Sequence, residues 1–558
     1  MIFYENVRST AGIFCAEHLL VIAVISLIFA ITALPLAKKY LQILQQLSYQ
    51  TDGYLSWLKK RPNDYNMRLL MLALLGVLAY ALIVCAFVFA GKDFVSYIAF
   101  IPFFSFVLIY VLGDKKHADK CPLKITARVK RLSFALAILA FALCFLFSTA
   151  VDALCFSFKE SAVLCALRLG LNLFLIALLP YLLLVANVFV KPVENHIGKK
   201  YVARCKEKLA KCENLVKIAV TGSYGKTTVK TILKDVLSVR FNVLATPESY
   251  NTPMGICKSV ELLNPSHEIF IAEMGARHKG DVKDLCEIVK PDMGIITGIC
   301  AQHLETFKTI DRIVETKFEL ADYLKNKPIV LSSDNELTAS NVSKCADSKV
   351  VMAGIVGERA DVYAENIKTG AFGSVFDLVT KNGRISVRTS LLGKHNVSDV
   401  CLASAIAISL GMSNEEIAEG IAKTTCAHNR LELVPNDNGL TIIDDSYNAN
   451  EMGVKAAIEV MQSFEGRKIV VTPGLVEMGE RQVKVNREFG KSLCFADFVI
   501  LVGTRSAYNV REGLFEGGYD FDKVFCVKTL DEAKEKLKET VKAGDVVLFE
   551  NDLPDRFL

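Results

Sequence analysis

The stretch "KIAVTGSYGKTTVKTIL", Lys217–Leu233, decides the fold class of the second part of the chain. It begins with a short apolar run typical of a buried strand, continues through Thr221–Gly225 as a turn with two glycines, and ends in a helical pattern over residues 227–237. A strand, a glycine turn and a helix N-terminus in this order hold phosphate groups with backbone N–H groups. The stretch therefore predicts a nucleotide site, although the common phosphate-loop pattern needs a glycine where this chain has Val220.

The pattern that remains is G-x-x-G-K-T-T, from Gly222 to Thr228. Its lysine, Lys226, is expected to reach the β and γ phosphates of a nucleotide, and the hydroxyl of Thr227 or Thr228 is expected to contact Mg²⁺. The alternative is that a loop of this composition binds no ligand. The residues predicted to bind the nucleotide here are Gly222, Ser223, Tyr224, Gly225, Lys226, Thr227 and Thr228.

Short apolar runs alternate with amphipathic segments from Val216 onward, which favours a parallel sheet covered by helices on both faces. The runs are "VKIAVTG", "EIFIAEMG", "MGIITGI", "PIVLSS", "TIIDDS", "KIVVTPG", "FVILVG" and "DVVLFE". The region 349–392 has short strands and glycine turns instead, which predicts a small antiparallel insert. A second α/β unit, of Rossmann-like type, is expected to begin near His428.

The first 195 residues differ, because they contain five apolar runs long enough to cross a bilayer, which takes about 20 residues. The predicted spans are Leu19–Ala37, Leu69–Ala90, Phe94–Leu112, Leu132–Ala150 and Leu169–Val190. The first run lacks the basic start and the small-residue cleavage site of a signal peptide. We therefore expect an α-helical membrane region, with membrane lipid as one partner.

Basic residues predict the orientation of these spans. The connection 38–68 carries six Lys or Arg and the connection 113–131 carries seven, whereas the other connections carry few. Basic residues stay on the cytoplasmic side of a membrane. We therefore expect the N-terminus outside the cell membrane and everything after Val190 in the cytoplasm. The charged segment 194–214 has apolar residues at helical spacing, which predicts a short amphipathic helix on the membrane surface.

Composition excludes other classes. The net charge of +5, with no long basic run, argues against nucleic acid as a partner. The 16 cysteines include no C-x-x-C pair, so they predict reduced packing residues, not disulfides or a zinc site. The predicted domains are a five-span region (1–195), a central nucleotide-binding α/β domain (196–427, with its insert) and a C-terminal α/β domain (428–558).

The nucleotide-binding half resembles the Mur ligase family, the ATP-dependent amide ligases of peptidoglycan precursor synthesis. Their phosphate loop has the form G-x-x-G-K-T-T and does not depend on the first glycine, which accounts for Val220. Further motifs extend the resemblance from Lys217 to Val476. The segment "DDSYNAN", Asp444–Asn450, is the most specific, and it is similar to the branch of the family that adds D-alanyl-D-alanine.

The resemblance implies a role for each residue at a matching position. Thr227, Glu273, His303 and a carbamylated Lys317 would form the Mg²⁺ site, and Lys226, His303 and Lys317 would be catalytic. Asn396 would contact adenine, Arg430 the phosphates, and Asp445 the ribose or the metal. The implied substrate contacts are Asn251, Thr252, Tyr447, Asn448 and Asn450, with turn formation as the alternative for Asn448 and Asn450.

The implied reaction transfers the γ-phosphoryl group of ATP to a muropeptide carboxylate, and an amine such as D-alanyl-D-alanine then displaces phosphate. Hard Mg²⁺ prefers oxygen ligands, which Glu273 would supply from the end of a strand. Carbamylation of Lys317 would need a neutral amine and hence a lowered pKa.

Three departures from the family pattern leave the substrate open. No domain that grips the UDP part of a nucleotide-linked precursor precedes Lys217, the C-terminal "GDVVLFENDLPDRFL" replaces a usual Lys-Gly-Ser turn, and Asp399 stands where Asn is usual. The muropeptide is therefore either nucleotide-linked or lipid-linked. A poly-γ-glutamate synthetase and a catalytically inactive scaffold are alternatives. A transport ATPase is disfavoured, because the chain has no "LSGGQ" signature and no Walker-B Asp-Glu.

Overall fold

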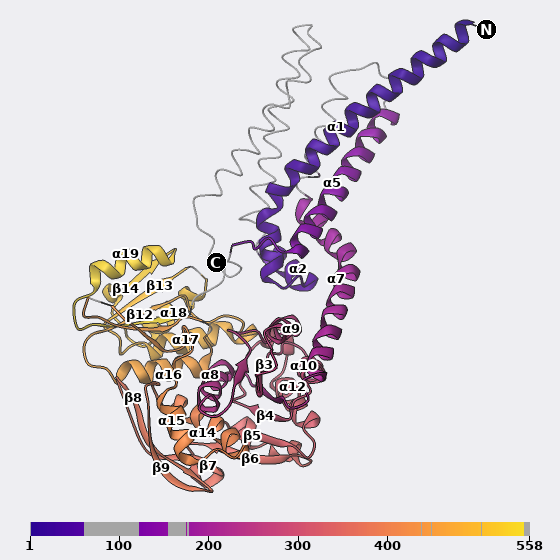
Figure 1. Cartoon of the computed structure of the whole chain (residues 1–558). Coiled ribbons are helices and arrows are strands. Elements are labelled where there is room, and N and C mark those ends of the chain that lie inside the picture. Colours follow the sequence, from indigo (N-terminus) through magenta and orange to yellow (C-terminus); the bar gives the residue numbers. More distant parts are fainter. Residues whose placement is uncertain are drawn as a thin grey trace. The chain divides into compact units, whose positions relative to one another are not determined.

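The computed structural model describes residues 2–60, 122–154, 175, 178–436, 438–447, 449–503 and 505–551 (Figure 1). The described residues fall into two compact units, one ending at Ile197 and the other beginning at Gly198. Each unit has a hydrophobic core of its own.

The first unit is helical. Its core joins α1 (Ile2–Gln46), α2 (Thr51–Lys60), α5 (Ala127–Leu154) and the first part of α7 (Leu179–Ala210). The chain's one tryptophan, Trp57, packs in this core against the rings of Tyr40 and Tyr54. Large apolar side chains are also exposed on the outer faces of α1 and α5, and they include Leu20, Leu27, Ile31, Phe134, Ile138 and Leu146.

Two helical segments among the described residues, Ile22–Gln46 and Ala127–Ala150, are long and apolar enough to cross a membrane. They contain most of the first predicted span and all of the fourth. The second and third predicted spans lie outside the described residues, and the fifth lies partly outside them. The number of five spans therefore stays a prediction.

Helix α7 corrects the prediction of a separate short surface helix over residues 194–214. The helix is continuous from Leu179 to Ala210 and includes Pro192. Cys205 and Leu209 are buried in the core of the second unit, and Tyr201 and Val202 pack against the same core. Most apolar side chains in this part therefore pack against protein, and contact of the segment 194–214 with a membrane surface stays a prediction.

The second unit contains a nine-stranded sheet with the order β2-β3-β1-β4-β5-β6-β7-β8-β9. The strands are β1 (Val216–Thr221), β2 (Val243–Ala245), β3 (Ile269–Met274), β4 (Met293–Ile296), β5 (Pro328–Ser332), β6 (Lys349–Gly354), β7 (Val362–Gly370), β8 (Gly373–Thr380) and β9 (Gly383–Thr389). The strands from β2 to β7 pair in parallel, and β7, β8 and β9 pair antiparallel. The predicted insert is therefore wrong in extent, because β6 continues the parallel sheet and β7–β9 extend the same sheet.

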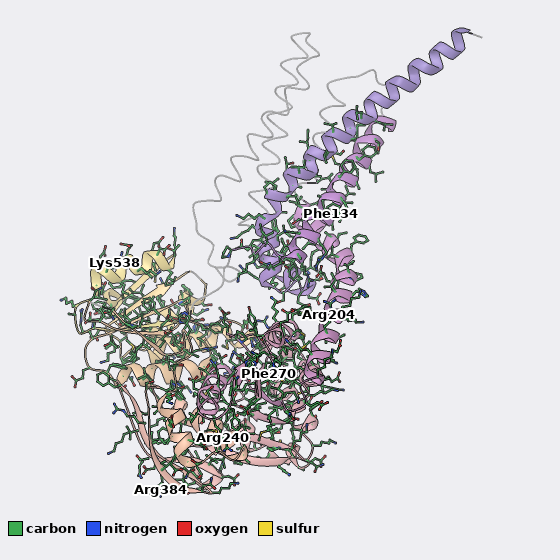
Figure 2. The ribbon with its side chains drawn as sticks, in the orientation of Figure 1. Phe134, Arg204, Arg240, Phe270, Arg384 and Lys538 are labelled. Atoms are coloured by element: carbon green, nitrogen blue, oxygen red, sulfur yellow. The ribbon has the colours of Figure 1, made fainter. Side chains whose placement is uncertain are left out.

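Helices cover both faces of this sheet, as the apolar strands predict. One face packs against α8 (Lys226–Leu237), α14 (Lys394–Ser409) and α15 (Asn414–Ala422). The other packs against α9 (Pro253–Glu261), α10 (Asp281–Val289) and α12 (Ile310–Tyr323). Phe270 of β3 is fully buried against the second group (Figure 2). Two short helices, α11 (Leu304–Phe307) and α13 (Glu336–Ala339), follow β4 and β5.

A second sheet of six strands follows, with the order β10-β11-β15-β12-β13-β14. Its strands are β10 (Glu432–Val434), β11 (Thr441–Asp445), β12 (Lys468–Thr472), β13 (Phe498–Val502), β14 (Val524–Val527) and β15 (Val546–Glu550). All neighbours except β10 and β11 are parallel. Helices α16 (Glu451–Gln462), α17 (Gln482–Ser492) and α18 (Arg505–Glu516) contribute to the core on one face, and α19 (Leu530–Thr540) covers the other.

Candidate functional site

The glycine loop connects β1 to α8 as predicted. Gly225 has a φ of +77°, a left-handed conformation that favours glycine, and a Cβ on Gly222 would lie 1.9 Å from the Thr297 hydroxyl. The backbone N–H of Ser223 donates to the Gly298 carbonyl at 2.8 Å, which ties the loop to the end of β4. The Lys226 ammonium donates to the carbonyls of Gly222 and Ser223 at 2.9 and 3.0 Å. The loop thus curls around its own lysine at the N-terminus of a three-turn helix.

Glu273 lies beside this loop, because β3 pairs with β1 and places Glu273 opposite Val220. Its side chain is 1% exposed. The Thr227 hydroxyl and the Lys230 ammonium donate to one carboxylate oxygen at 3.0 and 3.1 Å, and the Asn251 amide donates to the other at 3.0 Å. Lys230 also donates to the Glu248 carbonyl. A buried carboxylate is therefore held by three donors next to the phosphate loop.

The Thr227 and Glu273 oxygens fit a Mg²⁺ site. They form a hard oxygen pair at the helix N-terminus, and it is Thr227, not Thr228, whose hydroxyl reaches Glu273. Among the described residues, no three His, Cys, Asp or Glu side chains gather into a metal cluster. Protein sites usually hold Mg²⁺ through one or two carboxylates, with substrate phosphates and water as the other ligands.

Lys317 of α12 is buried near the same loop, with 3% of its surface exposed. Burial lowers the pKa of Lys317 to about 7, and the nearby positive charge of Lys226 contributes to this shift. A large neutral fraction of this amine at neutral pH is the condition that carbamylation requires.

His303 is the N-cap residue of α11 and lies within electrostatic range of Lys226. Its Nδ1 is 2.5 Å from the carboxylate of Glu477, which follows β12 in the second sheet. Both residues have left-handed φ values, +55° for His303 and +65° for Glu477, which is uncommon for non-glycine residues and typical of functional sites. Burial lowers the pKa of His303 and favours a neutral ring, while the Glu477 carboxylate opposes this shift. Glu477 therefore fixes the ring orientation and leaves Nε2 for a ligand.

Arg430 brings a further positive charge from the second sheet. Its charge contributes to lowering the pKa of Lys226, after the larger effect of burial. Its guanidinium lies 4.5 Å from the ring centroid of Tyr447, which is 49% exposed. Asp445 ends β11 nearby and accepts the backbone N–H of Leu431 at 3.2 Å. Burial raises the pKa of Asp445 to about 6, against the effect of Arg430.

Hydrogen bonds and electrostatic interactions connect the six residues that make up the site predicted from the sequence. They are Lys226, Glu273, His303, Lys317, Arg430 and Asp445. Two of them, Lys226 and Arg430, are cations at the phosphate loop, where an anionic ligand would neutralise them. Positive groups around a buried carboxylate and a glycine loop can hold a triphosphate and stabilise negative charge during phosphoryl transfer.

The family model of the Mur ligase middle domain matches residues 220–407, and that of the Mur ligase, glutamate ligase domain matches residues 429–550. Together the two matches cover more than half of the chain. The chain belongs to the Mur ligase family. Its central nine-stranded sheet and its six-stranded sheet are thus the middle and C-terminal domains of a Mur ligase.

Individual Mur ligases give the same result. The chain is 30% identical to the UDP-N-acetylmuramoyl-tripeptide–D-alanyl-D-alanine ligase of Buchnera aphidicola, over 50% of this chain and 61% of that protein. It is 29% identical to the Bacillus subtilis ligase of the same name, over 60% and 72%. A crystal structure of the MurF ligase from Thermotoga maritima in complex with ADP covers 64% of this chain and 80% of that chain, with 25% identity and a TM-score of 0.57. The chain thus spans about three fifths of the first relative's length, and the helical unit lies outside the residues that the two family models match.

Several residues that were predicted to contact the substrate make hydrogen bonds within the protein. Thr252 accepts the Gly255 N–H and caps α9, and Asn450 accepts the N–H groups of Met452 and Gly453 and caps α16. Asn251 contacts Glu273, on the side predicted for the metal, and the structure shows nothing that assigns it to the substrate. Asn448 lies outside the described residues. The predicted roles of these residues stay proposals.

Two predicted nucleotide contacts are occupied by protein groups. Tyr224 packs against Gly298, and its hydroxyl accepts the Asn335 amide at 3.2 Å. Asn396, in the first turn of α14, donates to the Leu392 carbonyl at 2.7 Å. Tyr224 shapes the loop through this packing, and contact of Asn396 with adenine remains a prediction.

Sequence reasoning missed Lys230 and Glu477. Lys230 follows Lys226 by four residues, so helical spacing places both on one face of α8 and was a usable signal. Glu477 lies in the motif "VTPGLVEMGE", but its sequence separation of 174 residues from His303 hides the contact.

Asp399, which stands where the family has Asn, leads to a pH-dependent prediction. Its carboxylate lies against Gly225 of the phosphate loop, where a Cβ on that glycine would be 3.1 Å from Oδ1. Burial raises the pKa of Asp399 well above its usual range, and the neighbouring Asp334 adds to the effect. A neutral acid at this position would not repel a bound phosphate.

We expect Asp399→Asn to raise the thermal midpoint of the ligase more at pH 8 than at pH 5. The folded chain keeps the Asp399 proton at a pH where the unfolded chain has lost it, so stability of the natural protein falls as pH rises, by about 1.4 kcal/mol per pH unit in this window. The variant does not titrate there. Calorimetry at the two pH values measures the difference, and an equal shift at both would contradict a raised pKa.

Proposed function

We propose that this Mur ligase is an ATP-dependent amide ligase of peptidoglycan precursor synthesis, with an activity like that of UDP-N-acetylmuramoyl-tripeptide–D-alanyl-D-alanine ligase. The observation that carries the proposal is the position of the Lys226 and Arg430 charges at the glycine loop, beside the buried Glu273 and the buried Lys317 amine. Relatives that carry this name, and a relative solved with ADP, support it.

In the proposed reaction, a muropeptide carboxylate attacks the γ-phosphorus of ATP, and ADP leaves. Backbone N–H groups at the start of α8 and the Lys226 ammonium orient the β and γ phosphates. Arg430 neutralises charge that develops on the phosphoryl oxygens. Thr227 and Glu273 would hold Mg²⁺, which supplies charge neutralisation between the phosphates when bound. Lys230 and Asn251 keep the Glu273 carboxylate in place.

Lys317 and His303 act at the other side of the phosphoryl group in this proposal. The nitrogen of the neutral Lys317 amine would form a bond to the carbon of CO₂ and release one proton to water, which gives a carbamate, an anion with a longer reach than a carboxylate. Its burial and its pKa of about 7 support this role. His303, whose ring is oriented by Glu477, would present Nε2 toward the phosphoryl group.

ATP consumption by the detergent-purified full chain tests the proposal. The donors are a nucleotide-linked and a lipid-linked muropeptide, each with D-alanyl-D-alanine. ADP release should depend on one donor together with the dipeptide, and mass spectrometry should show the amide product. No stimulation by either muropeptide would reject a role in peptidoglycan synthesis, and donor-independent activity with glutamate would favour a poly-γ-glutamate synthetase.

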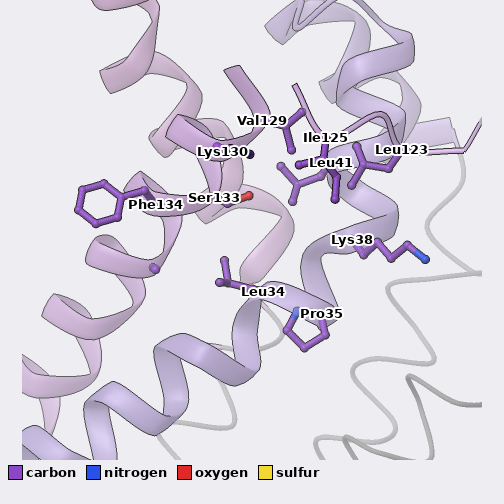
Figure 3. A pocket seen from close by; sticks show the side chains of 11 residues that line it. Leu34, Pro35, Lys38, Leu41, Leu123, Ile125, Val129, Lys130, Ser133 and Phe134 are labelled. Atoms are coloured by element: carbon purple, nitrogen blue, oxygen red, sulfur yellow. The ribbon is translucent and has the colours of Figure 1, made fainter. Parts of the chain in front are cut away.

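An apolar cavity in the helical unit favours the lipid-linked donor as the second candidate. The cavity has a volume of about 480 Å³ and is lined by α1, α5 and the segment before α5 (Figure 3). Leu34, Leu41 and Val129 contribute apolar walls, and the exposed Lys38 and Lys130 also line it. An acyl chain with a phosphate headgroup matches apolar walls flanked by two positive charges. We infer that this region binds a lipid and holds the enzyme at the cell membrane.

We expect the double variant Lys38→Glu and Lys130→Glu to weaken use of the lipid-linked donor only. Each basic residue near an anionic headgroup contributes about 1 kcal/mol, so reversing two charges should raise the donor KM roughly 10-fold or more. The KM for the nucleotide-linked donor should not change. Lys59→Glu on α2, exposed and outside the cavity, is the matched control. Equal loss with both donors would contradict a lipid site.

A further inference from the structure

Glu550, the last residue of β15, is a buried carboxylate that fold stability does not explain. Its side chain is 0% exposed, and neither carboxylate oxygen has a hydrogen-bond partner among the described residues. Burying an unpaired polar group costs free energy. A side chain held in this way at a strand end is suited to a ligand that supplies the missing donor.

Asp545, just before the same strand, is a carboxylate with a structural role and serves as a comparison for Glu550. It is also buried, at 3% exposure. Its oxygens accept two hydrogen bonds from Arg467 at 2.9 and 2.6 Å, and the backbone N–H of Lys542 donates to it at 2.7 Å. The two acids flank one strand of five residues, and only Asp545 is satisfied within the described part of the chain.

The position of Glu550 is one where parallel sheets bind ligands. β15 lies between β11 and β12, parallel to both, and Glu550 is opposite Asp445 in the register. The carboxyl ends of parallel strands meet at this edge. The charge of Arg430 acts on Glu550, on Asp445 and on Lys226, so the edge lies within electrostatic range of the phosphate loop.

The unpaired carboxylate indicates the kind of ligand. Glu550 lacks hydrogen-bond donors, and the neighbouring Asp445 and Asp444 make this edge acidic, so a cation that carries N–H groups suits it. In an amide ligase, the reactant that carries a single positive charge is the protonated amino group of the incoming amine. Its N–H groups are also the donors that the Glu550 oxygens lack.

We propose that Glu550, together with Asp445, binds the protonated amino group of the incoming amine. The assignment rests on the proposed ligase function. In the reaction, the ammonium gives one proton to the Glu550 carboxylate, and the freed nitrogen lone pair forms a bond to the carbonyl carbon of the acyl phosphate. The bond between that carbon and the phosphate oxygen breaks, and phosphate leaves with the electron pair and a second proton from nitrogen. Amide, hydrogen phosphate and a protonated Glu550 result.

Burial makes these acids suitable proton acceptors. It raises the pKa of Glu550 above its usual range, and the neighbouring Asp445 raises it further. A carboxylate in this environment takes a proton more readily than one in water. Glu550 is a candidate for the amine because of its position at the strand end and its missing hydrogen-bond donors, and its raised pKa agrees with this role.

The test compares Glu550→Gln with the natural full chain in detergent. Hydroxylamine, largely uncharged at neutral pH, traps the acyl phosphate as a hydroxamate and reports the first step alone. Ligation of D-alanyl-D-alanine reports the second. We expect unchanged hydroxamate formation and a rise in the dipeptide KM of roughly 10- to 100-fold, the usual effect of losing a hydrogen bond to a charged group. Because Gln removes an unpaired buried acid, the thermal midpoint should stay equal or rise.

Asp545→Asn is the matched control, with a lower thermal midpoint and an unchanged dipeptide KM expected. An unchanged KM in Glu550→Gln would overturn the amine assignment, and so would a parallel loss of hydroxamate formation, since that would place Glu550 in the first step. Absence of hydroxamate from the natural protein with either muropeptide would overturn the ligase function and the assignment with it. Hydroxamate formation with an unchanged KM would overturn the assignment alone.

Discussion

Lys226→Ala is expected to remove ATP turnover almost completely, on the order of 10³-fold, because a charged donor aimed at developing negative charge is usually worth 10²–10³ in rate. The Lys226 ammonium now donates to the carbonyls of Gly222 and Ser223 and so is held inside the loop that would surround the phosphates. Turnover measured with saturating muropeptide and amine should fall to background.

Folding should survive this change. Lys226 is buried near both Glu273 and Arg430, so its removal ends the cost of burying a charge and the repulsion by Arg430, while it loses two hydrogen bonds and the attraction to Glu273. The matched control is Lys234→Ala, at an exposed position on the same helix α8. Full turnover in Lys226→Ala, or equal loss in Lys234→Ala, would show that the loop does not bind the nucleotide as proposed.

The second large effect is expected at Glu273. Glu273→Ala should lower the free energy of unfolding by roughly 3–5 kcal/mol, because it leaves the buried Lys230 charge without its partner. Lys230 is 4% exposed and its ammonium lies 3.1 Å from the Glu273 carboxylate. Activity should also be lost, since the proposed Mg²⁺ site loses its carboxylate. Scanning calorimetry of the full chain measures the stability change.

A double variant separates the two roles of Glu273. Lys230→Met added to Glu273→Ala removes both buried charges, and stability should largely return, because replacing a buried ion pair by apolar groups is often neutral. Activity should stay lost. The exposed pair Lys279–Glu315, at 2.8 Å, is the control, and Glu315→Ala should leave the thermal midpoint nearly unchanged, because exposed ion pairs contribute little to stability. If the double variant were as unstable as the single one, the unpaired lysine would not be the cause.

The sequence was sufficient to predict the core of this site, because its residues are local to strand ends. The apolar runs predicted β1, β3, β4, β5, β11, β12, β13 and β15, and the G-x-x-G-K-T-T pattern predicted the loop. Parallel pairing then brings Glu273 of β3 beside the loop after β1 without any further information.

Contacts that depend on distant packing were not predictable in the same way. Nothing local to His303 indicates Glu477, because their contact depends on how two sheets pack within one unit. The predicted extent of the antiparallel insert was wrong, because β6 pairs in parallel with β5. β6 is short and apolar like its neighbours, so its sequence alone does not show in which direction it pairs. Glu550 was noticed only as part of an unusual C-terminus, since a missing hydrogen-bond partner is visible only in three dimensions.

The continuous helix α7 has a consequence for how the protein is made. Its first turns belong to the core of the helical unit, and Cys205 and Leu209 belong to the core of the ligase. During synthesis this helix leaves the ribosome before any ligase strand, so the nascent ligase folds onto a segment that is already present at high local concentration. A fragment that starts after Ala210 would expose the apolar surface that these residues cover, and we expect it to aggregate. A fragment that starts at Gly198 keeps that surface covered and should stay in solution.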